Sequence, residues 1–235
     1  QQETPNQIKA VMAEMNRAMA ELKLGDQPRP HGIWTHLYTG NQNISYSSFG
    51  ALTDTMEKSS QWSRVDVRVG SREFDNGNFN SYANNNGIIM DSLPLEGDPL
   101  AIQRSIWLSL DKAYKEAAVV YNEKKAALKG QPRPELPDIL SADSQWYGSL
   151  NQTPAPIKSV ESLTRLLSQP DKKDHGLEEL NAVVSDTHLI ETMLSSEGHQ
   201  IQYPKTRFIM RAEAIARAED GASIRNSRSW VYKNR

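Results

Sequence analysis

The feature that most constrains the fold is a long helical pattern over residues 98–129. Apolar side chains recur there at intervals of three and four residues, as they do along one face of a helix. They are Ile102, Ile106, Leu110, Ala113, Ala117, Val120, Tyr121 and Leu128. Asp98 is suited to cap the first turn, Pro99 suits the first helical position, and Gly130 and Pro132 end the pattern. Such a helix spans roughly 45 Å at 1.5 Å per residue, which is enough to lie across a whole sheet.

Two shorter helices are predicted, one on either side of this long one. Residues 8–24 carry apolar side chains at helical spacing, and the "GDQPRP" that follows breaks the pattern. We interpret this helix as packed on a sheet, in preference to a methionine-lined ligand groove. The other helix covers Ile157 to Leu167 and is stopped by Pro170.

The clearest strand pattern is "QWSRVDVRVG", residues 61–70. Three valines alternate there with charged side chains: Val65, Val67 and Val69 against Arg64, Asp66 and Arg68. This period of two is typical of a strand with one face in a core and one face in water. We therefore expect the valines to face the core.

Other segments with strand texture are residues 31–40, 43–53, 87–95, 187–196, 199–220 and 221–235. The first two would form a hairpin with its turn at Gly40 to Gln42, and residues 87–95 would form a short edge strand. Arg207 to Ala218 contains helix-favouring residues, but its apolar positions alternate and turn signals flank it, so we favour a strand. The sequence thus predicts an α+β fold, with an antiparallel sheet packed by about three helices.

Composition excludes several classes of protein. The chain has 235 residues, enough to bury a sizeable core as one large domain or two small ones. Its 27 basic and 29 acidic residues give a net charge of −2, which does not indicate nucleic-acid binding. Because Cys is absent, disulfides, thiolate nucleophiles and Cys-bound metal sites are excluded. No apolar run approaches the roughly 18 residues of a membrane span.

Histidine spacing does not predict a zinc site. The five histidines are His31, His36, His175, His188 and His199. His31 and His36 would point to opposite faces of one strand, and so would His188 and Glu191. The pair His175 and Glu179 follows a turn, which disfavours a shared helix face. We therefore predict no metal-binding residue in this chain.

The Asn- and Gly-rich stretch after residue 70 could suggest a calcium loop. Counted from Asp75, Gly77 falls third, Phe79 fifth and Asn86 twelfth, so the ligand positions of an EF-hand are not met. We favour turns at Asn76-Gly77 and Asn86-Gly87, with Asn side chains bonding to their own backbone, over a looser calcium loop. No His partner is predicted for the acids of this stretch.

Motifs for nucleophilic catalysis and phosphate binding are also missing. Neither G-x-S-x-G nor G-x-G-x-x-G occurs, and the adjacent Glu178 and Glu179 are best explained as a solvated face. From the residues alone, we predict no catalytic residue, no cofactor-binding residue and no cofactor in this chain.

The order of the segments resembles the N-terminal half of the TldD/PmbA family, candidate metallopeptidases once called modulators of DNA gyrase. The most specific pieces are V-D-V-R-V-G at residues 65–70, D-P-L-x-x-x-R-x-x-W-L at residues 98–108 and the S-E-G turn at residues 196–198. The resemblance implies a single α+β N-terminal domain over residues 1–235, with a Pro-rich connection at 130–156. It also implies a β-rich C-terminal domain, beyond this chain, that binds zinc through H-E-x-x-x-H in active members. That motif is absent from these residues.

The resemblance further implies a scaffold, dimerisation or substrate-cavity role within a protein that hydrolyses peptides. The expected partners are the C-terminal domain, a second subunit in a homo- or heterodimer, and a peptide substrate. The alternatives are a stand-alone exported binding module without enzymatic activity, and a partner subunit that lacks the zinc motif. A bacterial protein is expected, exported if Gln1 follows a removed leader and cytoplasmic otherwise.

Overall fold

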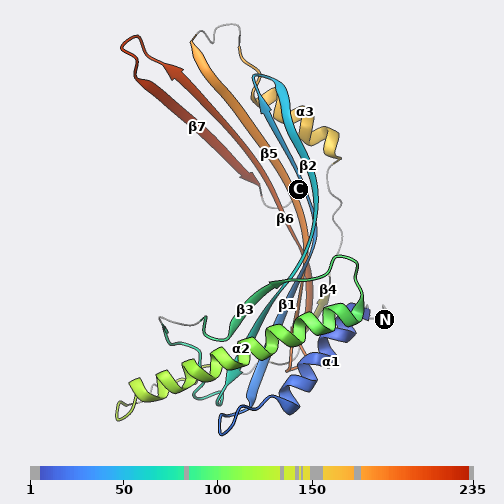
Figure 1. Ribbon diagram of the computed structural model, residues 1–235, viewed down its shortest axis with the longest axis vertical. Coiled ribbons are helices and arrows are strands. Elements are labelled where there is room, and N and C mark those ends of the chain that lie inside the picture. Colours follow the sequence, from blue (N-terminus) through green and yellow to red (C-terminus); the bar gives the residue numbers. More distant parts are fainter. Residues whose placement is uncertain are drawn as a thin grey trace. The chain divides into compact units, whose positions relative to one another are not determined.

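The computed structural model describes residues 6–81, 85–132, 135–140, 143, 145–148, 156–171 and 176–232. These residues form three helices and seven strands, which confirms the predicted α+β class (Figure 1). The elements are α1 (Asn6–Glu21), β1 (Pro30–Ser48), β2 (Ala51–Val69), β3 (Ile88–Ser92), α2 (Pro99–Ala127), β4 (Trp146–Gly148), α3 (Ile157–Leu167), β5 (Leu177–Ser195), β6 (Gln200–Arg217) and β7 (Ser223–Tyr232).

All the strands belong to one sheet in the order β3-β2-β1-β5-β6-β4, and β7 also pairs with β6. β4 runs parallel to β6, whereas the edge strands β3 and β7 run antiparallel to their neighbours. β1 and β5 are antiparallel as well, because Ser196 N donates to Ile33 O and Phe49 N donates to Leu180 O. The predicted antiparallel sheet is confirmed, with short β4 as its parallel addition.

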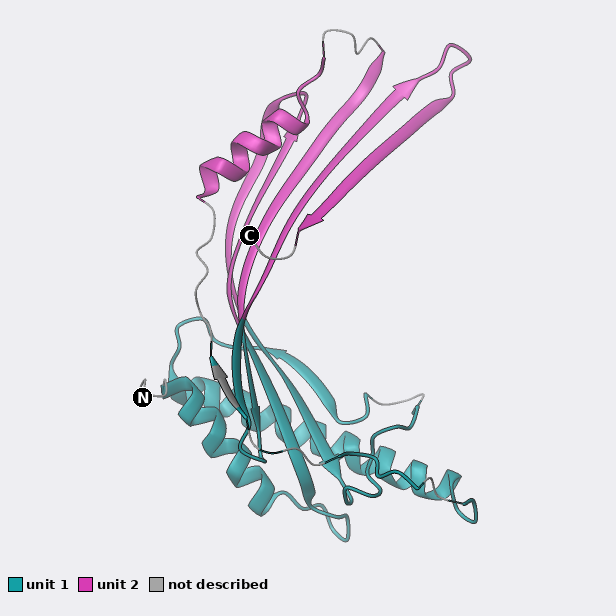
Figure 2. Cartoon of the chain, turned by 180° about the vertical axis from the view of Figure 1, so that it is seen from behind, with its two compact units in different colours: residues 1–38, 61–148, 191–203 teal, residues 39–60, 149–190, 204–235 magenta. Residues whose placement is uncertain are grey.

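The chain divides into two compact units (Figure 2). Unit 1 comprises residues 1–38, 61–148 and 191–203, and unit 2 comprises residues 39–60, 149–190 and 204–235. Each of the long strands β1, β2, β5 and β6 contributes residues to both units. The single domain proposed over residues 1–235 stays a prediction.

The core of unit 1 lies between the sheet and helices α1 and α2. Val65, Val67 and Val69 are fully buried there, as their alternation predicted. Ile33 of β1 and Ile106 of α2 belong to the same apolar cluster. Burying each such side chain contributes roughly 1.5–3 kcal/mol, so this face of the sheet carries much of the stability of unit 1. The predicted cap of the long helix is also present, with Leu100 N donating to Asp98 Oδ1 at 3.1 Å.

The core of unit 2 is smaller and lies under α3. Val160 of this helix packs with Val184 of β5 and Phe208 of β6. Two buried serines attach the end of α3 to the β1–β2 hairpin. Ser47 and Ser168 share a hydrogen bond of 2.7 Å between their hydroxyl oxygens, and Ser168 Oγ accepts from Gly50 N at 3.0 Å.

The predicted hairpin turn at Gly40 to Gln42 is wrong, because β1 runs straight through these residues. Glycine serves a different purpose at position 40. A Cβ atom there would lie 1.9 Å from His188 O, so the missing side chain lets β1 and β5 approach closely. The chain turns instead at Phe49 and Gly50, whose φ angles are +47° and +79°. Gly50 favours a positive φ and is the local signal for this turn, whereas Phe rarely adopts one, so Phe49 does not indicate it.

Two strand segments were not predicted. β5 begins at Leu177, well before residue 187, and β2 includes the polar residues 54–60. The polar part of β2 lies beyond its pairing with β3, which involves Trp62 to Asp66. It is therefore an edge strand in unit 2, and charged and polar side chains are typical of exposed edges.

The remaining predicted elements are confirmed. α3 has the predicted bounds, β3 is an edge strand, and Arg207 to Ala218 lies almost entirely in β6. Much of the Pro-rich connection at 130–156 lies outside the described residues, although it contains β4. None of the described helices is both long and apolar enough to cross a membrane.

Candidate functional site

The Asn-rich loop after β2 is held by one buried amide. Asn76 is fully buried, and its Oδ1 accepts from Val69 N at 2.7 Å. Its Nδ2 donates to Val67 O at 3.1 Å and to Asn86 O at 2.7 Å. The side chain thus extends the hydrogen bonding of β2 in place of a neighbouring strand. Asn76 bonds across the loop to distant backbone groups, which differs from the predicted bonding to its own backbone.

Asp75, beside it, has a histidine partner that was not predicted. Its carboxylate is fully buried, with Oδ2 lying 3.3 Å from His31 Nε2 and Oδ1 accepting from Gly77 N at 2.5 Å. Arg68 Nη1 lies 3.8 Å from the same Oδ1. The expectation that these acids lack a His partner is therefore wrong. The pairing joins residues 44 positions apart, and only the folded sheet brings them together.

A buried lysine completes this network. Lys124 of α2 donates to Gly77 O at 2.7 Å and to Asp138 Oδ2 at 2.5 Å, and its ammonium lies 4.8 Å from the centre of the Phe74 ring. Burial opposes ionisation of Asp138, but the hydrogen bonds from Lys124 and from Asp75 N hold its pKa below the usual value. The network fixes the loop and part of the Pro-rich connection in place, so we interpret it as structural.

The histidines lie apart from one another. His36 pairs with Glu191 at 2.8 Å, His188 with Asp186 at 2.8 Å, and His199 with Glu197 at 3.7 Å. His175 lies outside the described residues. Within the described parts of the chain, no group of three or more His, Asp or Glu side chains is placed to hold a metal ion.

The most unusual chemistry lies on the face of the unit 1 sheet opposite α1 and α2. Here Glu191 of β5 is 3% exposed, and its Oε1 accepts from His36 Nδ1 at 2.8 Å and from Tyr38 OH at 2.9 Å. Tyr203 of β6 donates to the same carboxylate. The Tyr38 ring stacks on Trp62 of β2, with ring centres 3.7 Å apart. We call these five residues the Glu191 cluster.

Strand alternation explains why these side chains meet. In β1, Ile33 and Leu37 point to the helices, so His36 and Tyr38 point to the other face. In β2, the buried valines place Trp62 on that same face. The cluster is thus assembled from four strands. The alternation of side chains along a single strand could be predicted from the sequence, but the order of the strands in the sheet could not.

The cluster raises the pKa of both tyrosines. Burial is the largest cause for Tyr38, followed by its hydrogen bond to Glu191 and the charge of that carboxylate, and together they raise the pKa to about 12. The same causes raise the pKa of Tyr203 to about 12. Both phenols are therefore neutral donors at neutral pH. A carboxylate only accepts hydrogen bonds, so Nδ1 of His36 carries the proton that it donates to Glu191.

This arrangement is suited to recognition. Glu191 receives several donors and acts as a hub that fixes the His36 and Tyr38 rings in place. Among its partly exposed groups are two cationic or imidazole donors: the side chains of His36 and Arg64 are 18% and 31% exposed, and Arg64 Nη2 also lies 3.6 Å from Asp66 Oδ2. A rigid aromatic stack flanked by partly exposed hydrogen-bond donors can hold an extended polar ligand. Strongly raised pKa values are common at functional sites, which also favours this face.

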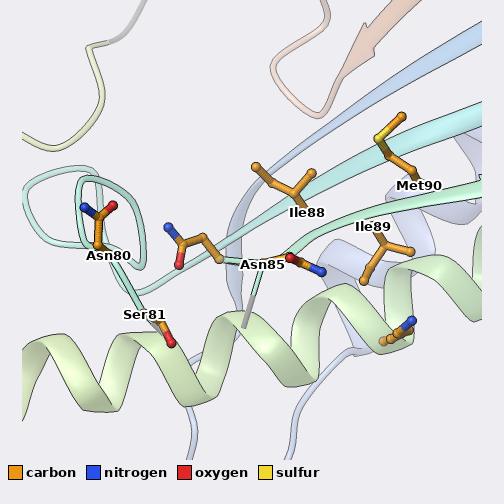
Figure 3. Close-up of a pocket in the computed structure, with 8 residues that line it drawn as sticks. Asn80, Ser81, Asn85, Ile88, Ile89 and Met90 are labelled. Atoms are coloured by element: carbon orange, nitrogen blue, oxygen red, sulfur yellow. The ribbon is translucent and has the colours of Figure 1, made fainter. Parts of the chain in front are cut away.

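A separate pocket of about 520 Å³ lies between β3 and the Asn-rich loop in unit 1 (Figure 3). Its lining consists of Asn80, Ser81, Asn85, Asn86, Ile88, Ile89, Met90 and Lys112. Figure 3 shows Ile88 and Met90 pointing away from α2 and Ile89 pointing toward it, as the alternation of β3 requires. The described residues of the lining offer amides, one hydroxyl, apolar groups and one ammonium, and none of them carries a carboxylate or imidazole for acid–base chemistry.

Solved structures with a similar fold exist, although no protein-family model and no curated protein matches the chain. One is a candidate modulator of DNA gyrase from Bacteroides thetaiotaomicron, with 13% sequence identity and a TM-score of 0.57. The similarity covers 97% of this chain and 45% of that protein. Another is TldE from Thermococcus kodakarensis, with 10% identity and a TM-score of 0.50, covering 96% of this chain and 43% of that one.

This likeness confirms the predicted resemblance at the level of fold. The similarity extends over nearly all of this chain, so it does not depend on one common motif. The chain nevertheless spans less than half the length of these two proteins.

Proposed function

We propose, from the fold shared with these proteins, that this chain is the N-terminal scaffold domain of a TldD/PmbA-like protein. The observation that supports this most is a structural likeness covering 97% of the chain. The larger size of the similar proteins leaves room for a second, catalytic part. In this proposal the whole protein hydrolyses peptides, and a zinc ion held by H-E-x-x-x-H in the second part supplies the Lewis acid.

The proposed contribution of this chain is one wall of the substrate cavity. The open face that carries the Glu191 cluster supports this role, because its rings are fixed by hydrogen bonds before any ligand arrives. An extended peptide could stack an aromatic or proline side chain beside Trp62. Its backbone carbonyl groups or C-terminal carboxylate could accept hydrogen bonds from Arg64.

We also infer partners and location from this assignment. The C-terminal domain of the same protein and a second subunit, identical or related, would complete the cavity. A bacterial protein, exported or cytoplasmic, fits this proposal.

Peptide binding by the isolated chain tests the role of the open face. A dye-labelled unstructured peptide, followed by fluorescence anisotropy, should bind wild-type chain and remain uncleaved. Trp62→Ala should weaken binding about tenfold, which corresponds to roughly 1.4 kcal/mol, a typical contribution of one aromatic contact. Trp230→Ala, on β7 in unit 2, is the matched control and should bind normally. Absent binding, or equal affinity of wild type and Trp62→Ala, would reject this role.

A further inference from the structure

The charge of the chain is distributed unevenly, and strands β6 and β7 are strongly basic. Their basic residues are Lys205, Arg207, Arg211, Arg217, Arg225 and Arg228, and their acidic residue is Glu213. Six basic side chains and one acidic one give these two strands a net charge of +5, whereas the whole chain carries −2. Such a concentration of one sign attracts ligands of the opposite charge.

The pairing of the strands places several of these arginines on one face of unit 2. Phe208 of β6 belongs to the core under α3, so the odd-numbered Arg207 and Arg211 point to the opposite face. In β7, Arg225 pairs with Ile215 and therefore lies on that same face. α3 is the only helix among the described residues of unit 2, so no described helix covers this face (Figure 2). We call it the β6–β7 basic face.

The arginines of this face are exposed and share little negative charge. The side chains of Arg211 and Arg225 are 54% and 66% exposed. Both lie near one carboxylate, because Arg211 Nη2 donates to Glu213 Oε2 at 3.2 Å and Arg225 Nε lies 3.8 Å from Glu213 Oε1. Arg207 is exposed and forms no ion pair within the described parts of the chain. A carboxylate ligand would therefore meet positive charge that is not yet compensated.

A hollow of about 300 Å³ lies on the same face beside Arg211. Its lining consists of Tyr46, Asn181, Ala182, Val183, Arg211 and Glu213. β5 lies between β1 and β6, so Val183 forms an apolar floor between Tyr46 and Arg211. A small apolar side chain could enter between the phenol ring and the guanidinium group, with the amide of Asn181 available to a backbone group of the ligand.

The spacing of the arginines favours a peptide segment over a small anion. Arg207 and Arg211 are four residues apart on an extended strand, roughly 13 Å, which is more than one carboxylate or phosphate bridges. An extended peptide has the same repeat, so acidic residues four positions apart could reach both guanidinium groups.

The residue between these arginines favours a peptide over a nucleic acid. Ile209 lies between Arg207 and Arg211 and pairs with Val231 of β7. Proteins that bind single-stranded nucleic acid combine cations with aromatic rings on which the bases stack. Aliphatic side chains occupy that position here, and they suit an aliphatic side chain of a peptide.

We propose that the β6–β7 basic face binds acidic peptide segments in extended conformation. Two acidic side chains of the peptide form charge-assisted hydrogen bonds to Arg207 and Arg211, and an apolar side chain enters the hollow beside Tyr46. The site lies within unit 2, so this inference goes beyond the proposed function and does not rest on the Glu191 cluster of unit 1. Because exposed arginines hold the peptide, its affinity should fall as the salt concentration rises.

Fluorescence anisotropy with a designed peptide tests the proposal. A labelled peptide with glutamates four positions apart and leucines between them should bind wild-type chain, and the same peptide with glutamine in place of glutamate should not. Arg207→Glu and Arg211→Glu should each weaken binding at least about tenfold, the loss of one charge-assisted hydrogen bond. Arg228→Glu is the matched control on the same strand pair. Arg228 pairs with Ala212, which lies on the α3 side, so this variant should bind within about threefold of wild type.

Absence of binding between wild-type chain and the acidic peptide would overturn the proposal. So would an equal loss of affinity in Arg228→Glu, which would show that net charge alone attracts the peptide. Tighter binding of a labelled single-stranded oligonucleotide through Arg207 and Arg211 would identify a nucleic-acid surface and reject the peptide assignment. Trp62→Ala should bind the acidic peptide as wild type does, so the cavity role of unit 1 and this site succeed or fail separately. Weaker binding by Trp62→Ala would place the peptide on unit 1 and contradict the inference.

Discussion

At the scale of single residues, side chains here often replace backbone partners. Asn76 supplies the hydrogen bonds that a neighbouring strand would give to the end of β2. Lys124 ties a loop carbonyl to Asp138, and Glu191 holds two phenols and an imidazole. In each case a polar group is buried with its partners satisfied, which makes the local geometry rigid and its loss costly.

Removing the side-chain amide of Asn76 should lower the free energy of unfolding by more than the loss of one small side chain suggests. Asn76→Ala would leave Val69 N and two carbonyl groups without their partner. We expect the free energy of unfolding in urea to fall by about 2–4 kcal/mol, since each unpaired buried group costs roughly 1–3 kcal/mol. Asn80→Ala, at an exposed position of the same loop, should stay within about 0.5 kcal/mol of wild type. A loss below about 1 kcal/mol for Asn76→Ala would contradict this role.

The raised tyrosine pKa values predict a decline of stability at high pH. Tyr38 and Tyr203 titrate near pH 12 when folded and near pH 10 when unfolded. The native state therefore keeps these protons longer, and the free energy of unfolding should fall between about pH 10 and pH 12. The contribution of the two tyrosines to the free energy of unfolding is fully present below pH 10.

Denaturant melts at several pH values, with tyrosinate absorbance as a second readout, would measure this decline. Tyr38→Phe should make the decline of stability with pH shallower, because one of the two phenols that keep their proton in the native state is gone. Tyr46→Phe, at an exposed position, should leave the decline unchanged. Equal slopes for wild type and Tyr38→Phe would show that Glu191 does not hold Tyr38 in its neutral form.

At the scale of elements, the sequence predicted what depends on local pattern. Helix α3 and the N-cap of α2 follow from spacing and capping residues, and the valines of β2 follow from alternation. The failures involve partners far along the chain. Gly40 resembles a turn residue but fits against β5, and the turn occurs at Phe49 and Gly50, where only the glycine favours a positive φ. His36 and Tyr38 were visible as one face of a strand, but Glu191 was not visible as their partner.

The close approach of β1 and β5 makes Gly40 sensitive to substitution. A Cβ at this position would meet backbone atoms of His188 and Leu189, which cannot rotate away as a side chain would. We expect Gly40→Ala to lower the free energy of unfolding by about 2 kcal/mol or more. Gly25→Asn is the control, since nothing lies near its Cβ and Asn tolerates a positive φ. A thermal melt of Gly40→Ala that overlays wild type would disprove the close packing.

At the scale of the whole molecule, the two faces of the unit 1 sheet differ. One face of the unit 1 sheet carries the Glu191 cluster, and the other face is covered by helices α1 and α2. The fold is shared with much longer proteins over nearly all of this chain. In the proposed function, this chain would be a scaffold that binds peptide, and the chemistry of hydrolysis would belong to a second, catalytic part.

The most direct test of this division is the zinc content of the isolated 235-residue chain. After incubation with zinc and exhaustive dialysis, plasma emission spectrometry should find far less than one zinc per chain. In the described residues, the histidines pair individually with separate carboxylates, and none joins a group of three ligands. One zinc per chain, retained through dialysis and accompanied by peptide cleavage, would place the catalytic centre within these residues and contradict a scaffold role.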